Sequence, residues 1–238
     1  MSGWMVPPPG LAVKRDADLR REREEKVAEL GRRQLLRSEG LRRAMLAVRR
    51  EDFIPLAYRD HAYEEVPLPL PGERATISCP HSYPLFYEPL GLHEGHRFLE
   101  VGVGSGYGTA LAREVVGPRG MVVAIDIDAT TLAFARHNLE RAGCADVVLV
   151  HGDGGLGYAK HAPYDRICVT AACPAVPPPL IEQLAESGRL IAPVLDEGAR
   201  QRLTLLERTI DGVRSTIIAE VLYVSLQGRY GVGSDPHL

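Results

Sequence analysis

The sequence predicts an α/β fold, a doubly wound and mostly parallel sheet of seven strands with helices on both faces. Short apolar runs alternate with helix-forming segments from residue 97 to residue 194, a spacing typical of parallel strands joined by helices. The last two strand-like runs meet at Asp211-Gly212, a dipeptide typical of hairpins, so the sheet is expected to end antiparallel. Charged, helix-forming sequence precedes the first run and predicts an N-terminal helical extension.

Local sequence predicts each element in turn. Strands are expected at 97–101, 121–125, 147–150, 164–170, 189–194, 202–209 and 213–226, and helices at 109–116, 132–142 and 179–185. Before them, an amphipathic stripe predicts two or three helices that end near Val48, with Gly31 and Gly40 as interruptions. Between Phe53 and Pro89 the proline-rich sequence predicts a long structured loop, and loops of that length are usually functional.

Cysteine usage and charge narrow the classes of function. The cysteines lie far apart and form no CxxC pair, so we interpret them as reduced core residues and expect no metal; they are Cys79, Cys144, Cys168 and Cys173.

The chain has a net charge of −3, yet residues 14–50 hold 13 Lys or Arg against 7 Asp or Glu. Their signs alternate, which is typical of a solvated helix with i,i+4 ion pairs, although contact with nucleic acid is the other interpretation.

A glycine-rich loop follows the strand at 97–101 and precedes a helix. Glycine permits a tight turn with positive φ and lets a ligand approach the backbone. The spacing is GxGxG, whereas the nicotinamide fingerprint GxGxxG needs glycine where Tyr107 stands. We therefore expect S-adenosylmethionine as the cofactor. The residues expected to bind it lie in this loop and at the end of the strand before it; they are Glu100, Gly102, Val103, Gly104, Ser105 and Gly106.

Acidic residues end the next two strands. Asp126, with Ile127 beside it, stands where a carboxylate can accept hydrogen bonds from both ribose hydroxyls, and a helix cap is its alternative role. Asp153 lies between Gly152 and Gly154 and is expected to face the adenine, although glycine-aspartate pairs are also common turns. We expect these five residues after the strands to contact the cofactor.

Several segments, in order, resemble protein-L-isoaspartate O-methyltransferases. They are Thr76-Ile77-Ser78-Cys79-Pro80-His81, Ala162 to Ala172, Ile181-Glu182-Gln183-Leu184 and Gly188-Arg189-Leu190, preceded by Ala44 to Val48 and Arg50 to Pro55. The likeness extends from about Leu41 to Leu226. It implies the Rossmann-like class I methyltransferase fold, which ends in an antiparallel hairpin.

The resemblance implies an enzyme that methylates the free α-carboxylate of L-isoaspartyl residues in damaged proteins or peptides. The ester lets the backbone close to a succinimide, and hydrolysis returns part of it to aspartate. A carboxylate with a pKa of about 4 is already ionised at neutral pH, so its attack on a methyl group needs alignment and desolvation rather than a general base.

The family's motif also implies the acceptor site. Ser78 is the catalytic position and contacts the substrate carboxyl, while an ordinary turn serine is the alternative. Thr170, at the end of the fourth strand, borders both cofactor and substrate. The substrate-binding residues implied are Thr76, Ile77, Ser78, His81, Thr170, Ala171 and Ala172.

Departures from the family's pattern fall mostly beside the peptide side of the site; they are Ala75, Ser187, Leu195, Ser225 and the segment Ser82-Tyr83-Pro84-Leu85. They motivate a second hypothesis, a specialised carboxyl methyltransferase that acts on one dedicated peptide in a biosynthetic pathway. A third hypothesis of another class is a non-catalytic protein that binds the cofactor or nucleic acid through its basic helices. We expect peptides rather than nucleic acid as partners.

Length and hydropathy predict the organisation of the chain. With 238 residues and 45% apolar composition, it suits one main core with extensions. We divide it into a flexible tail (1–12), N-terminal helices with a substrate-covering loop (13–92) and an S-adenosylmethionine-binding methyltransferase domain (93–238). No apolar run approaches the roughly 20 residues that span a bilayer, so we expect a cytoplasmic protein without a membrane partner.

Overall fold

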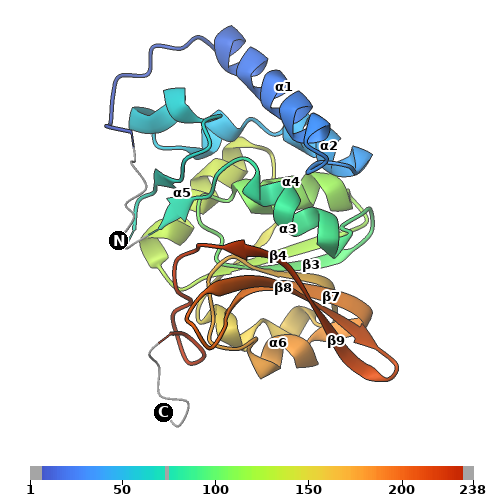
Figure 1. The fold of residues 1–238 in the computed structure, drawn as a ribbon. Helices are drawn as coiled ribbons and strands as arrows, with labels where there is room; N and C mark the ends of the chain where they lie inside the picture. The colour runs from blue at the N-terminus through green and yellow to red at the C-terminus, as the bar shows by residue number, and fades with distance from the viewer. Residues whose placement is uncertain (1–6, 73–74, 233–238) are drawn as a thin grey trace.

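A seven-stranded sheet forms the centre of the molecule (Figure 1), in a computed structural model that describes residues 7–72 and 75–232. Its strands are β3 (Arg97–Val101), β4 (Met121–Asp126), β5 (Val148–His151), β6 (Tyr164–Val169), β7 (Leu184–Leu195), β8 (Gln201–Thr209) and β9 (Gly212–Val221). They lie in the order β5-β4-β3-β6-β7-β8-β9. The pairs from β5 to β7 are parallel and the last two pairs antiparallel, which confirms the predicted sheet and its terminal hairpin.

Helices cover both faces of this sheet. They are α1 (Asp16–Arg32), α2 (Glu39–Ala47), α3 (Ser82–Leu90), α4 (Tyr107–Val116), α5 (Ala129–Arg141) and α6 (Pro178–Glu182). The first five lie on one face and α6 on the other (Figure 1). Alternate residues of β3 point to opposite faces of the sheet. Phe98 packs in the core beneath the N-terminal helices, while Leu99 packs in the core that contains Leu180 of α6. All three side chains are fully buried.

The strand order places a ligand site at one point of the sheet. The chain leaves β3 towards β4 but leaves β6 towards β7, in opposite directions. In open α/β sheets, ligands bind outside the carboxyl ends of the strands where the winding direction reverses. The residues that follow β3 and β6, Gly102 and Thr170, therefore stand at this position.

The N-terminal helices differ from the predicted boundaries. Gly31 lies in the last turn of α1 and Gly40 in the first turn of α2, so neither interrupts a helix as expected. The break falls at residues 33–38, where Gln34 has a φ of 58°. Helix ends tolerate glycine well, which makes a glycine a poor marker of where the gap begins. The segment before α1 is tied down at Gly10, whose N–H donates to the carbonyl of Ala57 over 2.9 Å, and residues 1–6 of the expected tail lie outside the described residues.

The expected loop between Phe53 and Pro89 contains regular structure. It holds the 3-10 turn η2 (Leu56–His61), a two-stranded hairpin of β1 (Leu68–Pro69) and β2 (Thr76–Ile77), and α3. Another 3-10 turn, η1 (Arg50–Phe53), ends where this segment begins. The loop prediction was wrong for α3 because Pro84 stands in its first turn, where a backbone N–H has no helical partner. We call residues 62–72 and 75–78, which include this hairpin, the covering loop; residues 73–74 between them lie outside the described residues.

The last helix and the last parallel strand of the sheet also differ from the predicted boundaries. The helix α6 ends at Glu182 and β7 begins at Leu184, earlier than the expected strand at 189–194. An irregularity in the β6–β7 pairing accommodates the early start, and Ser187 adopts a φ of 60° there. In the described part of the chain, no helix is both long and apolar enough to cross a membrane.

Candidate active site at the carboxyl ends of β3, β4 and β6

The glycine loop has a left-handed backbone at its three glycines and packs closely against Thr170, the residue that follows β6. Gly102, Gly104 and Gly106 have φ values of 90°, 54° and 84°. A Cβ at Gly102 would lie 2.4 Å from the hydroxyl of Thr170, which itself donates to the carbonyl of Gly102 over 2.8 Å. Glycine at 102 is therefore required both by the left-handed conformation and by the close approach of β6. Of the other predicted loop residues, Val103 packs against α5 and Ser105 is buried, with its carbonyl bound by Asn138.

Asp126 connects the end of β4 to the glycine loop. Its Oδ2 accepts from the N–H of Gly104 and its Oδ1 from the N–H of Asp128, each over 3.1 Å. Burial raises the pKa of Asp126, and these N–H bonds oppose the rise. The α5 cap is Asp128, which accepts from Thr131 N, so Asp126 does not serve as that cap. Each oxygen keeps a lone pair for a further donor, which fits two ribose hydroxyls. The neighbouring Ile127 is 38% exposed.

Glu100 lies behind the loop rather than on its surface. It is 3% exposed and accepts hydrogen bonds from the hydroxyls of Tyr87, at 3.2 Å, and Thr109. Burial raises the pKa of Glu100 to about 7, although both hydrogen bonds lower it. Asp126 contributes to the rise by like-charge repulsion. The site thus contains two carboxylates with raised pKa values.

Asp153 accepts one hydrogen bond from its own turn and one from a distant segment of the chain. Its Oδ1 accepts from Gly155 N over 2.9 Å, and its Oδ2 accepts from Arg229 N, 76 residues away, over 2.7 Å. A Cβ at Gly228 would come within 2.4 Å of the same carboxylate. Asp153 therefore anchors the C-terminal segment against the turn after β5. No pattern in the sequence around Asp153 predicts a hydrogen bond to a residue so far along the chain.

The glycines beside Asp153 differ from one another. Gly152 faces open space, since no atom lies within 4 Å of a Cβ added there. Gly154 is buried, and its Cβ would lie 2.4 Å from a methyl carbon of Val101. Gly152 is thus the one with room for a ligand, whereas Gly154 is glycine because β3 packs against it.

The covering loop, which precedes the glycine loop in the chain, lies close to it in the structure. The carbonyl of Thr76 would lie 3.8 Å from a Cβ on Gly104, and the hydroxyl of Thr131 in α5 donates to the carbonyl of Pro71 over 3.0 Å. Thr76 is exposed and Ile77 is buried. The hairpin therefore spans the carboxyl ends of β3 and β4.

A small cavity brings three predicted site residues together. It has a volume of about 20 Å³ and is lined by Ser78, Ser82, Tyr83, Phe86, Tyr87, Glu100, Cys168, Thr170 and Tyr223. This volume is enough for about one water molecule. Sequence reasoning predicted Ser78, Glu100 and Thr170 but missed the aromatic wall, which α3 and the end of the chain supply. The unusual aromatic at Tyr83 was the only available signal.

Ala171 and Ala172 follow Thr170 and are buried, at 8% and 1% exposure. Ala172 donates its N–H to the carbonyl of Val224, and its carbonyl accepts from Leu226 N, both over 2.8 Å. These bonds join the end of β6 to the C-terminal segment. Their place beside the methyl-transfer position remains a prediction.

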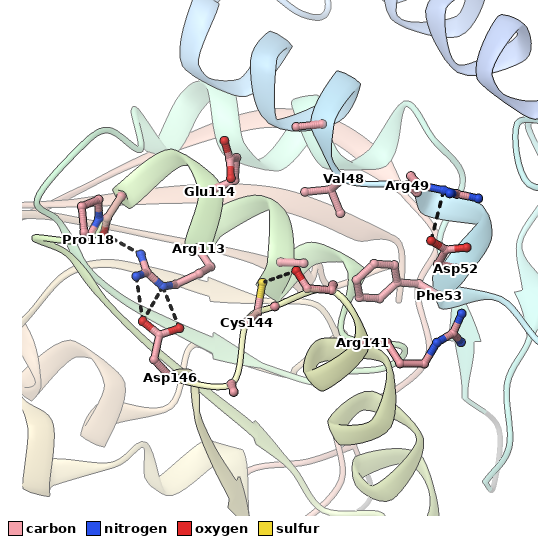
Figure 2. A pocket seen from close by; sticks show the side chains of 16 residues that line it. Val48, Arg49, Asp52, Phe53, Arg113, Glu114, Pro118, Arg141, Cys144 and Asp146 are labelled. Carbon is pink, nitrogen blue, oxygen red and sulfur yellow. Dashed lines mark hydrogen bonds and ion pairs between the residues drawn. The ribbon is translucent and has the colours of Figure 1, made fainter.

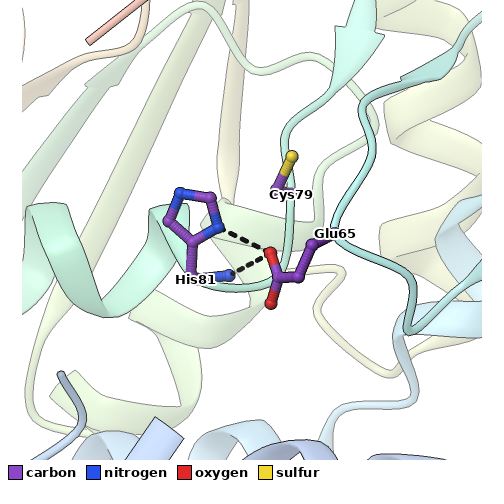
Figure 3. Close-up of side chains that lie close together, drawn as sticks. All are labelled: Glu65, Cys79 and His81. Carbon is purple, nitrogen blue, oxygen red and sulfur yellow. Dashed lines mark hydrogen bonds and ion pairs between the residues drawn. The ribbon is translucent and has the colours of Figure 1, made fainter. Parts of the chain in front are cut away.

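His81 has a carboxylate partner (Figure 3). Its Nδ1 lies 2.5 Å from Glu65 Oε2, and Lys26 of α1 lies 3.1 Å from the other oxygen of Glu65. Burial raises the pKa of Glu65, but His81 and Lys26 together hold it at about 2. Cys79 stands beside this pair, and the three possible ligand atoms lie within 4.8 Å of one another. Because the ammonium of Lys26 already neutralises Glu65, we interpret the group as an ion-pair network that ties the covering loop to α1.

A larger hollow of about 860 Å³ lies elsewhere, between α2, η1 and the carboxyl ends of α4 and α5 (Figure 2). None of the predicted site residues lines it. Four of its charged side chains form two ion pairs, Arg113 with Asp146 over 2.7 Å and Arg49 with Asp52 over 3.2 Å. The predicted site residues Ser78, Glu100 and Thr170 line the small cavity under the covering loop and not this hollow.

The chain is similar to known proteins in both sequence and fold. The model of the family described as Protein-L-isoaspartate(D-aspartate) O-methyltransferase matches residues 21–231. A protein-L-isoaspartate O-methyltransferase of Hyperthermus butylicus is 44% identical over 227 residues, which cover 91% of this chain and 93% of that protein. A solved protein-L-isoaspartate O-methyltransferase superposes with a TM-score of 0.79 at 33% identity, covering 88% of this chain and 67% of that one.

A second solved structure shares the fold. It comes from Plasmodium falciparum, is in complex with S-adenosyl-L-homocysteine, and superposes with a TM-score of 0.77 at 24% identity over 86% of this chain and 98% of that one. The family match covers most of the chain, including the covering loop, the glycine loop and the terminal hairpin. This chain belongs to the protein-L-isoaspartate(D-aspartate) O-methyltransferase family.

Proposed function

We propose that this chain is an S-adenosylmethionine-dependent carboxyl O-methyltransferase that acts on the free α-carboxylate of L-isoaspartyl residues in proteins and peptides. The ester starts repair, because it allows closure to a succinimide and hydrolysis to aspartate. The observation that carries the proposal is the covering loop with Ser78, which shares one cavity with Glu100 and Thr170 at the point where the sheet reverses its winding.

The residues at this point fit the cofactor. Gly104 has a left-handed backbone and lets a ligand approach, Asp126 retains lone pairs for ribose hydroxyls, and Gly152 is open to an adenine beside Asp153. When bound, S-adenosylmethionine supplies a methyl group that its sulfonium centre makes electrophilic.

The protein's own groups act by orientation and exclusion of water. The Ser78 hydroxyl donates to the acceptor carboxylate and fixes which oxygen faces the cofactor side. Tyr83, Tyr87 and Tyr223 enclose the space behind it, which removes water that would solvate the carboxylate. A carboxylate is ionised at neutral pH, so these groups need not accept a proton from it.

A matched pair of peptides tests the proposal. An isoaspartyl peptide and its aspartyl twin are incubated with methyl-labelled S-adenosylmethionine, and base-labile label is counted in each. We expect label in the isoaspartyl peptide alone. Equal label in both peptides, or none in either, contradicts the proposed function.

A further inference from the structure

Arg50 is a buried arginine that connects the two ends of the covering loop. It begins η1 and is 1% exposed. Its Nε donates to the carbonyl of Ala62 over 2.6 Å, and its Nη2 donates to the carbonyl of Ser78 over 2.7 Å. Ala62 precedes the β1–β2 hairpin and Ser78 follows it. The guanidinium therefore fixes the backbone of the residue that we propose to bind the acceptor.

The charge of Arg50 lacks a counter-ion in the part of the chain that the structure describes. None of the carboxylates there lies within ion-pair distance of it, and its Nη1 is buried without a hydrogen-bond partner. The adjacent carboxylate of Glu51 is bound instead by Arg23, at 3.2 Å, and by the hydroxyl of Tyr63, at 2.5 Å. A buried cation is unfavourable unless an anion or a dipole compensates it. Arg50 is thus a desolvated positive charge with capacity for an anion.

The guanidinium of Arg50 packs against two aromatic rings, and one of them, that of Tyr83, lines the cavity of Ser78. The guanidinium carbon lies 5.3 Å from the ring centre of Tyr107 and 5.7 Å from that of Tyr83. Burial raises the pKa of Tyr83 to about 12, and the charge of Arg50 acts against that rise. Tyr83 lines the same cavity as Ser78. Cation–π contacts compensate a buried cation only in part, which leaves it available to a carboxylate.

We propose that Arg50 is a positioning residue and the buried counter-charge for the acceptor carboxylate. The inference rests on the proposed function, since it takes Ser78 as the residue that binds the acceptor. Arg50 holds Ser78 through its carbonyl and favours an anion beside the Ser78 hydroxyl. With an effective dielectric constant of about 20, Coulomb's law gives opposite charges within roughly 12 Å of each other an attraction that favours binding by about tenfold or more.

The same charge distinguishes substrate from product. Methylation forms a carbon–oxygen bond to the carboxylate as the sulfonium–methyl bond breaks, so the anionic acceptor becomes a neutral ester. An attraction to Arg50 is present before this step and absent after it. Arg50 therefore favours the unmethylated peptide over the ester and assists exchange of product for substrate.

The test compares an anionic with a neutral ligand. We measure KM for an isoaspartyl peptide and the inhibition constant of the same peptide with its α-carboxylate replaced by a carboxamide. In the unmodified protein the carboxamide binds about tenfold more weakly or worse. Arg50→Gln raises KM about tenfold and brings the two constants close together, while the Kd of S-adenosylhomocysteine changes less than about threefold. Arg50→Lys keeps the charge and retains most of the preference.

Arg113→Gln is the matched control, because Arg113 also binds a carbonyl, that of Gly117, but pairs with Asp146 far from the site. It leaves the preference unchanged. A preference that survives in folded Arg50→Gln overturns the inference alone. If Arg50→Gln does not fold, loss of the preference in folded Arg50→Lys overturns it. A wild-type protein that labels no isoaspartyl peptide overturns the inference together with the proposed function.

Discussion

Single residues control the site through their backbone conformation and their burial. Asp126 could be predicted from sequence, because an acidic residue at the end of the second strand stands next to the glycine loop in any such fold. Asp153 could be predicted as a turn residue but not as the partner of Arg229, since that contact depends on where the chain's end returns. The unpaired charge of Arg50 could not be predicted either, because its burial depends on packing between distant segments.

Gly102 and Gly152 form a matched pair of glycines in the proposed cofactor site. Gly102→Ala places a methyl group 2.4 Å from the Thr170 hydroxyl at a φ of 90°, so we expect it to lower the free energy of unfolding by about 2–4 kcal/mol. Gly152→Ala meets no atom within 4 Å and should change stability by less than about 0.5 kcal/mol. Urea denaturation measures both. Equal losses would show that packing around Gly102 is not the reason for glycine there.

Glu100 makes stability depend on pH. Its pKa is about 7 in the folded protein and near the ordinary value of 4.5 when unfolded, so between these values the folded state binds the extra proton. The stabilisation is therefore complete below about pH 4.5 and is lost as the pH rises through 7, by roughly 3 kcal/mol in total. Glu100→Gln should remove this slope. Urea denaturation of both proteins from pH 5 to pH 8 checks it, and identical slopes would count against a buried, protonated Glu100.

At the scale of elements, strands and the hairpin could be predicted because their apolar runs are bounded by glycine and proline. The helix α3 could not, because it contains Pro84 in its first turn and Pro89 next to its last residue, and prolines at such spacing are also typical of loops. The basic stretch of α1 forms ion pairs along its own surface, such as Arg21 with Glu25 and Arg33 with Glu29, which agrees with a solvated helix. Arg23 and Lys26 instead reach Glu51 and Glu65, and thus connect α1 to the segment that carries the covering loop.

Glu51 is the buried end of that connection, with 2% exposure. Glu51→Gln removes the negative charge and leaves Arg23 uncompensated, so we expect a loss of about 3 kcal/mol in the free energy of unfolding. Glu24→Gln, on the exposed face of α1, is the control and should change stability by less than about 0.5 kcal/mol. Urea denaturation at pH 7 compares the two. A Glu51 variant as stable as its control would mean that the ion pair does not hold the helix in place.

In the whole molecule, the site forms where three parts of the chain meet. The N-terminal region supplies the covering loop, the sheet supplies the glycine loop and Asp126, and the C-terminal segment binds Asp153. The division at residues 12 and 92 remains a prediction, and residues 1–6 and 233–238 lie outside the described part of the chain. The proposed acceptor site thus combines residues that no single sequence motif contains, which is why the cofactor was easier to predict than the details of acceptor binding.

The most direct test of the account is acceptor specificity across unrelated peptides. We would measure kcat/KM for several isoaspartyl peptides of different sequence, each beside its aspartyl twin, at one concentration of S-adenosylmethionine. A repair enzyme should methylate every isoaspartyl peptide, with values within about a hundredfold of one another, and leave every twin unlabelled. Methylation of a single peptide sequence only, or of aspartyl twins as well, would contradict it.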